Sequence, residues 1–230
     1  YTNLTVTIDS GDSAKGINAS GGSFGALEIT SAATLASLTL NSGIVTSDYG
    51  SRGATILLAG AGGVGVGHNT DIDVLAGATI SNSAIGGYAI NSSTSLDTTL
   101  NITNAGTIAV HDDADSVAIA LDDSDGGSVL NVINSGTIDA GVSGTALLLS
   151  GANSAVISNS GSINGAITAV SGDMDITNSA GAITGNINLG SNSGSSLSLS
   201  GGTITGNVSF GNASQMMTFS GGSLIGTVDS

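Results

Sequence analysis

Three features of the sequence predict an all-β fold, wound as a single-stranded parallel β-helix (a β-solenoid). Small and β-branched residues dominate the composition, with 37 Gly among 230 residues and no Pro, Cys or Trp. Glu, Gln, Lys and Arg, which usually fill the solvent-facing positions of helices, are nearly absent. A short phrase with an aliphatic centre also recurs at a period of about 20 residues, which indicates a stack of equivalent units.

The recurring phrase places an aliphatic residue shortly after one or two glycines in each unit. Its spacings toward the C-terminus are 20, 21 and 20 residues, and upstream they lengthen to 30 and 25. Because equivalent residues of successive coils lie above one another, we expect one stacked core column. The longer intervals predict loops that leave the coils in the N-terminal half, for example at 141–144. The six aliphatic residues are Ile108, Ile138, Ile163, Ile183, Ile204 and Leu224.

Four asparagines stand just before the turn of successive units: Asn104, Asn134, Asn159 and Asn178. If they stack, their amide groups can form a hydrogen-bonded ladder along the solenoid. The alternative is that asparagine occurs there only because it suits turns. Asn178 fits the ladder least closely, because Ala180 adds one residue between it and the aliphatic position.

The repeats are regular over about residues 100–230 and less regular over 1–99, where short alternating segments still predict strands. No composition break or linker divides the chain. We therefore expect a single elongated domain spanning residues 1–230, with coils of about 20 residues.

The charge balance excludes several classes of protein. Asp and Glu number 17 against 2 Lys and Arg, for a net charge of −15. Such a chain has no basic surface to neutralise phosphates, so we expect no nucleic-acid partner. The longest apolar run, 54–67, is too short for a spanning helix, so we expect no direct insertion into a membrane. Without cysteine, disulfides and thiolate metal sites are excluded.

The phrases at 134–138 and 201–210 resemble the repeats of autotransporter passenger regions and of filamentous-haemagglutinin-like adhesins. The resemblance covers about residues 100–230. It implies an extracellular protein at a bacterial cell surface that acts as adhesin, spacer or biofilm matrix, with no required cofactor and with host or cell-surface glycans among its partners. The repeat pattern of 224–228 and the strand pattern of 4–8 continue without a polar cap, so we also expect copies to associate head to tail into a homopolymer.

Two acidic clusters flank the apolar segment 117–121. Closely spaced carboxylates beside a glycine-containing turn are ligands that Ca²⁺ prefers. The intervening strand would hold the two clusters about 17 Å apart, so a single ion cannot use both. A Ca²⁺ site at one cluster and a solvated acidic loop both stay open. The carboxylates are Asp112, Asp113, Asp115, Asp122, Asp123 and Asp125.

Other patterns give little support for an enzyme. The run 60–65 matches the G-x-G-x-x-G fingerprint, but no helical pattern follows it. Asp71 with Asp73, and Asp173 with Asp175, would each place two carboxylates about 7 Å apart on one strand face, as inverting glycosidases can use. Any solvated strand face shows the same pattern. We therefore expect a non-enzymatic structural or adhesive protein, with two alternatives: a carbohydrate-active β-helix enzyme and a surface-layer lattice subunit with Ca²⁺-bridged contacts.

Overall fold

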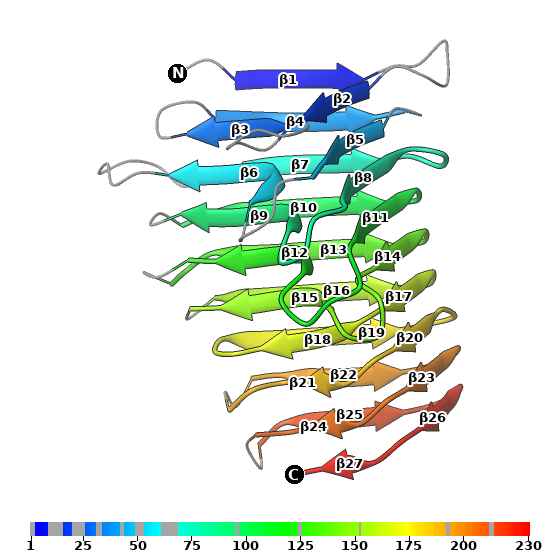
Figure 1. Cartoon of the computed structure of the whole chain (residues 1–230). Helices are drawn as coiled ribbons and strands as arrows, with labels where there is room; N and C mark the ends of the chain where they lie inside the picture. The colour runs from blue at the N-terminus through cyan, green and yellow to red at the C-terminus, as the bar shows by residue number, and fades with distance from the viewer. Residues whose placement is uncertain are drawn as a thin grey trace.

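A computed structural model shows an elongated stack of nine coils, each built from three short strands (Figure 1). Within the described part of the chain there are 27 strands and no helix, and therefore no helix of the length and hydrophobicity needed to cross a bilayer. At a strand spacing of about 4.8 Å, nine coils extend over roughly 40 Å. The structure describes residues 3–8, 16–19, 26–30, 34–41, 44–48, 53–60, 69–94, 97–123, 126–151, 153–191, 194–211 and 214–230.

The strands form three nine-stranded sheets, because every third strand along the chain pairs in parallel with the next. Sheet A contains β1 (Asn3–Ile8), β4 (Thr34–Leu40), β7 (Asn69–Val74), β10 (Thr99–Asn104), β13 (Val129–Asn134), β16 (Ser154–Asn159), β19 (Asp173–Asn178), β22 (Ser196–Leu199) and β25 (Met216–Phe219).

Sheet B contains β2 (Gly16–Ala19), β5 (Ile44–Ser47), β8 (Thr79–Asn82), β11 (Thr107–Val110), β14 (Thr137–Asp139), β17 (Ser162–Asn164), β20 (Ala182–Thr184), β23 (Thr203–Thr205) and β26 (Ser223–Ile225). Sheet C contains β3 (Leu27–Thr30), β6 (Ala54–Gly60), β9 (Tyr88–Thr94), β12 (Val117–Asp122), β15 (Thr145–Ser150), β18 (Ala166–Ala169), β21 (Ile187–Asn188), β24 (Val208–Ser209) and β27 (Val228–Asp229). Coils are numbered 1 to 9, so that coil 1 holds β1–β3 and coil 9 holds β25–β27.

This architecture confirms the predicted all-β parallel β-helix, including the longer coils of the N-terminal half. The register partners Leu40 and Val74 of adjacent coils are 34 residues apart, whereas Asn159 and Asn178 are only 19 apart. Alternation of apolar and polar residues explains the strands. In β19, for example, buried and exposed side chains alternate along the whole strand.

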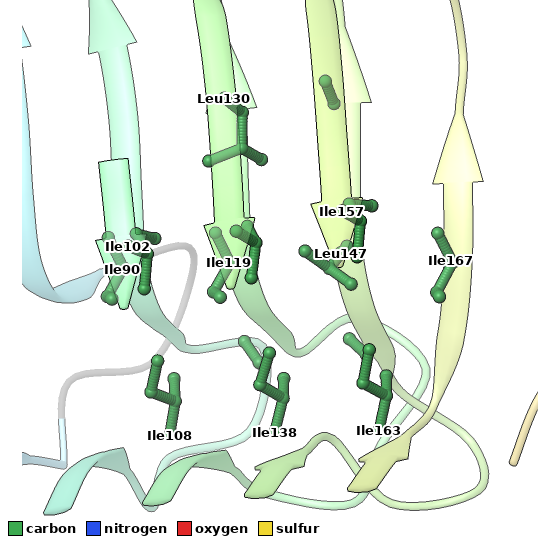
Figure 2. Close-up of a cluster of buried hydrophobic side chains, with 14 of the residues drawn as sticks. Ile90, Ile102, Ile108, Ile119, Leu130, Ile138, Leu147, Ile157, Ile163 and Ile167 are labelled. Atoms are coloured by element: carbon green, nitrogen blue, oxygen red, sulfur yellow. The ribbon is translucent and has the colours of Figure 1, made fainter. Parts of the chain in front are cut away.

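The six predicted aliphatic residues of sheet B lie in one register column, and Ile80 and Val45 extend it upward. A second column runs through sheet C, with Ile90, Ile119, Leu147 and Ile167 in successive coils (Figure 2). These isoleucines and leucines are 0% exposed from coil 3 to coil 8. Burying each such side chain stabilises the fold by about 1.5–3 kcal/mol relative to leaving it exposed. The list of the sheet B column is Val45, Ile80, Ile108, Ile138, Ile163, Ile183, Ile204 and Leu224.

Candidate functional site

The most irregular corner of the described coils lies between sheets B and C. In coils 3, 4 and 5 the chain crosses this corner through the loops 83–87, 111–116 and 140–144. In coil 6 the same corner is the single residue Gly165, and in coils 7 to 9 it is two residues, as at 185–186. Loops carried on a rigid scaffold are where binding residues concentrate. The three loops, called the three-loop cluster below, lie in the green part of the stack (Figure 1).

Acidic side chains of the middle loop join the three loops together. The Gly86 N–H of the first loop points to both carboxylate oxygens of Asp113, at 3.3 Å each, and to the Ser116 hydroxyl oxygen at 3.1 Å. The Ser143 N–H of the third loop donates to Asp112 Oδ1 at 2.9 Å. Each carboxylate therefore accepts a hydrogen bond from a backbone group of a neighbouring coil, which holds the cluster as one unit.

Asp113 also organises its own loop. Its carboxylate accepts hydrogen bonds from the Asp115 N–H at 2.9 Å and from the Ser116 hydroxyl, and His111 Nδ1 lies 3.5 Å from Asp113 Oδ2. Burial raises the pKa of Asp113, but the bonds from Ser116, Asp115 and Gly86, together with the charge of His111, outweigh this and lower the pKa below its usual 3.8. The fold thus favours the ionised form of this carboxyl.

A hollow of about 490 Å³ opens between the first two loops and the starts of the sheet C strands. This volume falls within the range of small-ligand sites. The hollow combines an aromatic ring from Tyr88 and a carboxylate from Asp115 with aliphatic side chains. Its lining residues are Ile85, Gly86, Tyr88, Ala114, Asp115, Val117, Thr145 and Leu148.

The six acidic residues considered as Ca²⁺ ligands are not brought together. Asp112, Asp113 and Asp115 lie in the three-loop cluster, whereas Asp122 and Asp123 follow at the far end of β12. No group of three or more His, Cys, Asp or Glu among the described residues is arranged to hold a metal ion. Asp125 lies outside the described residues, so its position is not part of this statement.

Asp123 differs from the solvated loop residue that the sequence suggested. It is fully buried, and the Ser128 hydroxyl donates a hydrogen bond to Asp123 Oδ2. Ser128 is itself fixed by its N–H, which donates to Asn153 Oδ1 at 3.0 Å. The neighbouring Asp122 is exposed and accepts a hydrogen bond from the Ser150 hydroxyl at 2.5 Å. Buried polar groups at this corner are thus paired with one another.

The four predicted asparagines form a continuous hydrogen-bonded chain inside the end of sheet A. Asn104 Nδ2 donates to Asn134 Oδ1 at 2.7 Å, Asn134 Nδ2 to Asn159 Oδ1 at 2.8 Å, and Asn159 Nδ2 to Asn178 Oδ1 at 2.7 Å. All four are buried. The same register column holds Val74 above them and Leu199 below them.

The paired carboxylates considered for catalysis alternate with buried residues on β7 and β19. Asp71 accepts a hydrogen bond from Asn101 Nδ2 at 2.7 Å, and Asp175 accepts one from the Ser196 hydroxyl at 2.6 Å. Asp173 accepts the Gly194 N–H at 3.0 Å. These carboxylates therefore pair with neighbouring coils on the outer face. Of the glycine-rich run, only Gly60 is described, at the end of β6, and 61–68 lie outside the described residues.

Sequence reasoning missed the three-loop cluster and its hollow. The only signal was the lengthened spacing of 30 and 25 residues between repeats, which locates extra chain without showing what it contacts. A scan against protein-family models finds no match, and no curated protein or solved structure is significantly similar to the chain.

Proposed function

We propose that this protein is a non-enzymatic, extracellular β-solenoid of a bacterial cell surface, with a structural or adhesive role, that associates end to end into fibres. One observation carries the proposal: the core columns run in register into coil 9, where their side chains open to solvent. Phe219 is 57% exposed, whereas Leu199 at the same position of coil 8 is 0% exposed. Val228 is 47% exposed, and Val208 above it is 0%.

Backbone hydrogen bonding supports the same proposal. The strands β25, β26 and β27 each pair with a strand of coil 8 on one side only. At the opposite end, β1, β2 and β3 each pair with a strand of coil 2 on one side only. Such edges are templates for strand addition. Coil 1 of a second copy, placed under coil 9, would extend all three sheets at once, and a head-to-tail contact of this kind repeats into an open filament.

The net charge of −15 limits association to the ends in this proposal. Copies that approach sideways repel one another, which keeps the rods soluble. The extracellular, cell-surface location and the place among autotransporter passengers or filamentous-haemagglutinin-like adhesins rest on the resemblance of the repeats at 134–138 and 201–210. The absence of cysteine agrees with that resemblance.

Electron microscopy and sedimentation of the purified 230-residue chain test the end-to-end contact. We expect rods several times longer than one molecule at high protein concentration. Phe219→Asp, which places a charge on the open end, should keep the protein monomeric. Ile133→Asp is the matched control, because Ile133 is 58% exposed but lies on β13 in the middle of the rod, and this variant should still form rods.

Dispersed single molecules of the unaltered chain at high concentration would contradict the proposal, as would equal loss of rods in both variants. Two further outcomes separate the alternatives. Assemblies that dissolve when a chelator is added would favour a Ca²⁺-bridged surface lattice. Release of reducing ends from acidic or neutral glycans, abolished by Asp71→Asn or Asp173→Asn, would favour a carbohydrate-active enzyme.

A further inference from the structure

We infer that the hollow of the three-loop cluster binds the cationic side chain, arginine or lysine, of a basic peptide segment on a partner protein. The inference is independent of end-to-end association, because the hollow lies on coils 3 to 5 and the open end on coil 9. It rests on three properties of the hollow: its hydrogen-bonding groups, its aromatic and aliphatic lining, and its charge.

The hollow offers hydrogen-bond acceptors more readily than donors. The backbone N–H groups of its lining residues are already used inside the fold: Tyr88 donates to the Gly53 carbonyl at 2.8 Å, and Val117 to the Gly87 carbonyl at 3.1 Å. The Thr145 N–H donates to the Ser116 carbonyl at 2.9 Å. A ligand that fits this hollow therefore brings its own donors.

The two loop residues of the lining show the same use of their amides. The Gly86 N–H is directed to Asp113 and Ser116, and the Asp115 N–H donates to Asp113. The carboxylate of Asp115 itself stands exposed beside the hollow. A phosphate or carboxylate ligand would meet this negative charge with no free backbone donor from these two residues, whereas a guanidinium or ammonium group would donate to it.

The aromatic and aliphatic lining suits the rest of a basic side chain. A cation placed over the ring of Tyr88 gains from the negative face of the aromatic system. The stem of arginine or lysine consists of methylene groups, which bury well against Ile85, Val117 and Leu148. Ile85 is 68% exposed at the rim, so a bound peptide would cover an apolar side chain that the fold leaves in water.

The charge of the molecule points in the same direction. The chain carries 17 acidic side chains and 2 Lys and Arg, and no basic residue lines the hollow. A protein with this balance attracts cationic partners over a distance and raises the rate at which they meet it. Charge complementarity therefore selects a basic peptide over acidic or neutral ones.

Fluorescence anisotropy with the 230-residue chain tests the inference. The probe is a fluorescein-labelled peptide with two arginines, and its control is the same peptide with both arginines replaced by citrulline, which keeps the shape and removes the charge. We expect the arginine peptide to bind and the citrulline peptide to bind at least about fivefold more weakly. Added salt should weaken the binding of the arginine peptide.

Variants of the protein locate the binding. Tyr88→Leu removes the aromatic ring but keeps an apolar side chain, and Asp115→Asn removes one charge from an exposed loop; each should weaken binding about fivefold. Asp175→Asn changes the net charge equally on the outer face of sheet A and should leave binding unchanged. Equal binding of both peptides, or equal weakening by Asp115→Asn and Asp175→Asn, would overturn the inference. Should Tyr88→Leu fail to fold by circular dichroism, the comparison of the two aspartate variants decides alone.

Discussion

The corner between sheets B and C is built in two ways, and the comparison separates what the solenoid requires from what it tolerates. Coils 3 to 5 cross it through loops of five or six residues, and coils 6 to 9 through one or two residues. The core column is the same on both sides of this change: Ile108 pairs with Ile138 across a loop, and Ile163 pairs with Ile183 without one. The register is thus fixed by the columns and not by the length of the connection.

The short corners depend on glycine for two reasons. Gly185 has a φ of 142°, and a Cβ there would lie 2.3 Å from the carbonyl oxygen of Gly165 in the coil above. Gly206 repeats this arrangement under Gly185, at 2.1 Å. In the longer corners, acidic side chains take over, since Asp112 and Asp113 accept the backbone N–H groups of adjacent loops. A coil therefore closes either by close backbone approach or by a loop that its neighbours hold.

The largest effect is expected from the part that both regions share. Ile138→Ala leaves a cavity in the sheet B column, and we expect it to lower the free energy of unfolding by about 2–5 kcal/mol. Urea denaturation followed by circular dichroism measures this change. Ile133→Ala, on the outer face of the adjacent strand β13, is the control and should change stability by less than about 0.5 kcal/mol. Similar losses in the two variants would show that the column does not carry the stability.

A smaller but still clear effect is expected at the short corner. Gly185→Ala forces a side chain into a left-handed backbone and against the carbonyl of Gly165, so we expect a loss of about 1–3 kcal/mol. Gly77→Ala is the matched control, because Gly77 has a φ of 87° but no atom within 4 Å of the added Cβ. The thermal unfolding midpoint should fall further for Gly185→Ala. An equal fall would mean that backbone strain alone, and not the close approach of coils, requires glycine there.

The columns could be predicted from the sequence because they repeat with nearly constant spacing. Ile163, Ile183 and Ile204 show the period directly, and Asn104 and Asn134 carry the same signal in polar form. The upper part of the same column, Val45 and Ile80, was not recognised, because coils of 30 or more residues hide the period.

The loop contacts could not be predicted, because they join side chains to backbone groups. The Gly86 and Ser143 N–H groups that bind Asp113 and Asp112 leave no mark in the identities of their own side chains. The burial of Asp123 was missed for a related reason. Its partner Ser128 follows it across residues of the same corner, and only the folded corner brings Asn153 of the next coil to Ser128.

The smallest effect is expected at the long corner, where ionised Asp113 holds the loops. Because hydrogen bonds and His111 lower its pKa below 3.8, its contribution to stability is present above pH 3.8 and is lost as the pH falls through the lowered value. In an NMR titration, the amide signals of Gly86 and Asp115 should therefore shift with a midpoint below 3.8. Since the contacts are confined to exposed loops, Asp113→Asn should change the unfolding midpoint by less than about 2 °C at neutral pH.

The same variant provides the control for this titration. Asp113→Asn should abolish the shift of the Gly86 amide, while the Ser143 amide, which donates to Asp112, keeps its own pH dependence. A Gly86 midpoint above 3.8 would contradict the role of Asp113, because the fold would then disfavour the ionised carboxylate. A large drop in the unfolding midpoint of Asp113→Asn would contradict the wider argument, since the loops would then support the coils instead of being carried by them.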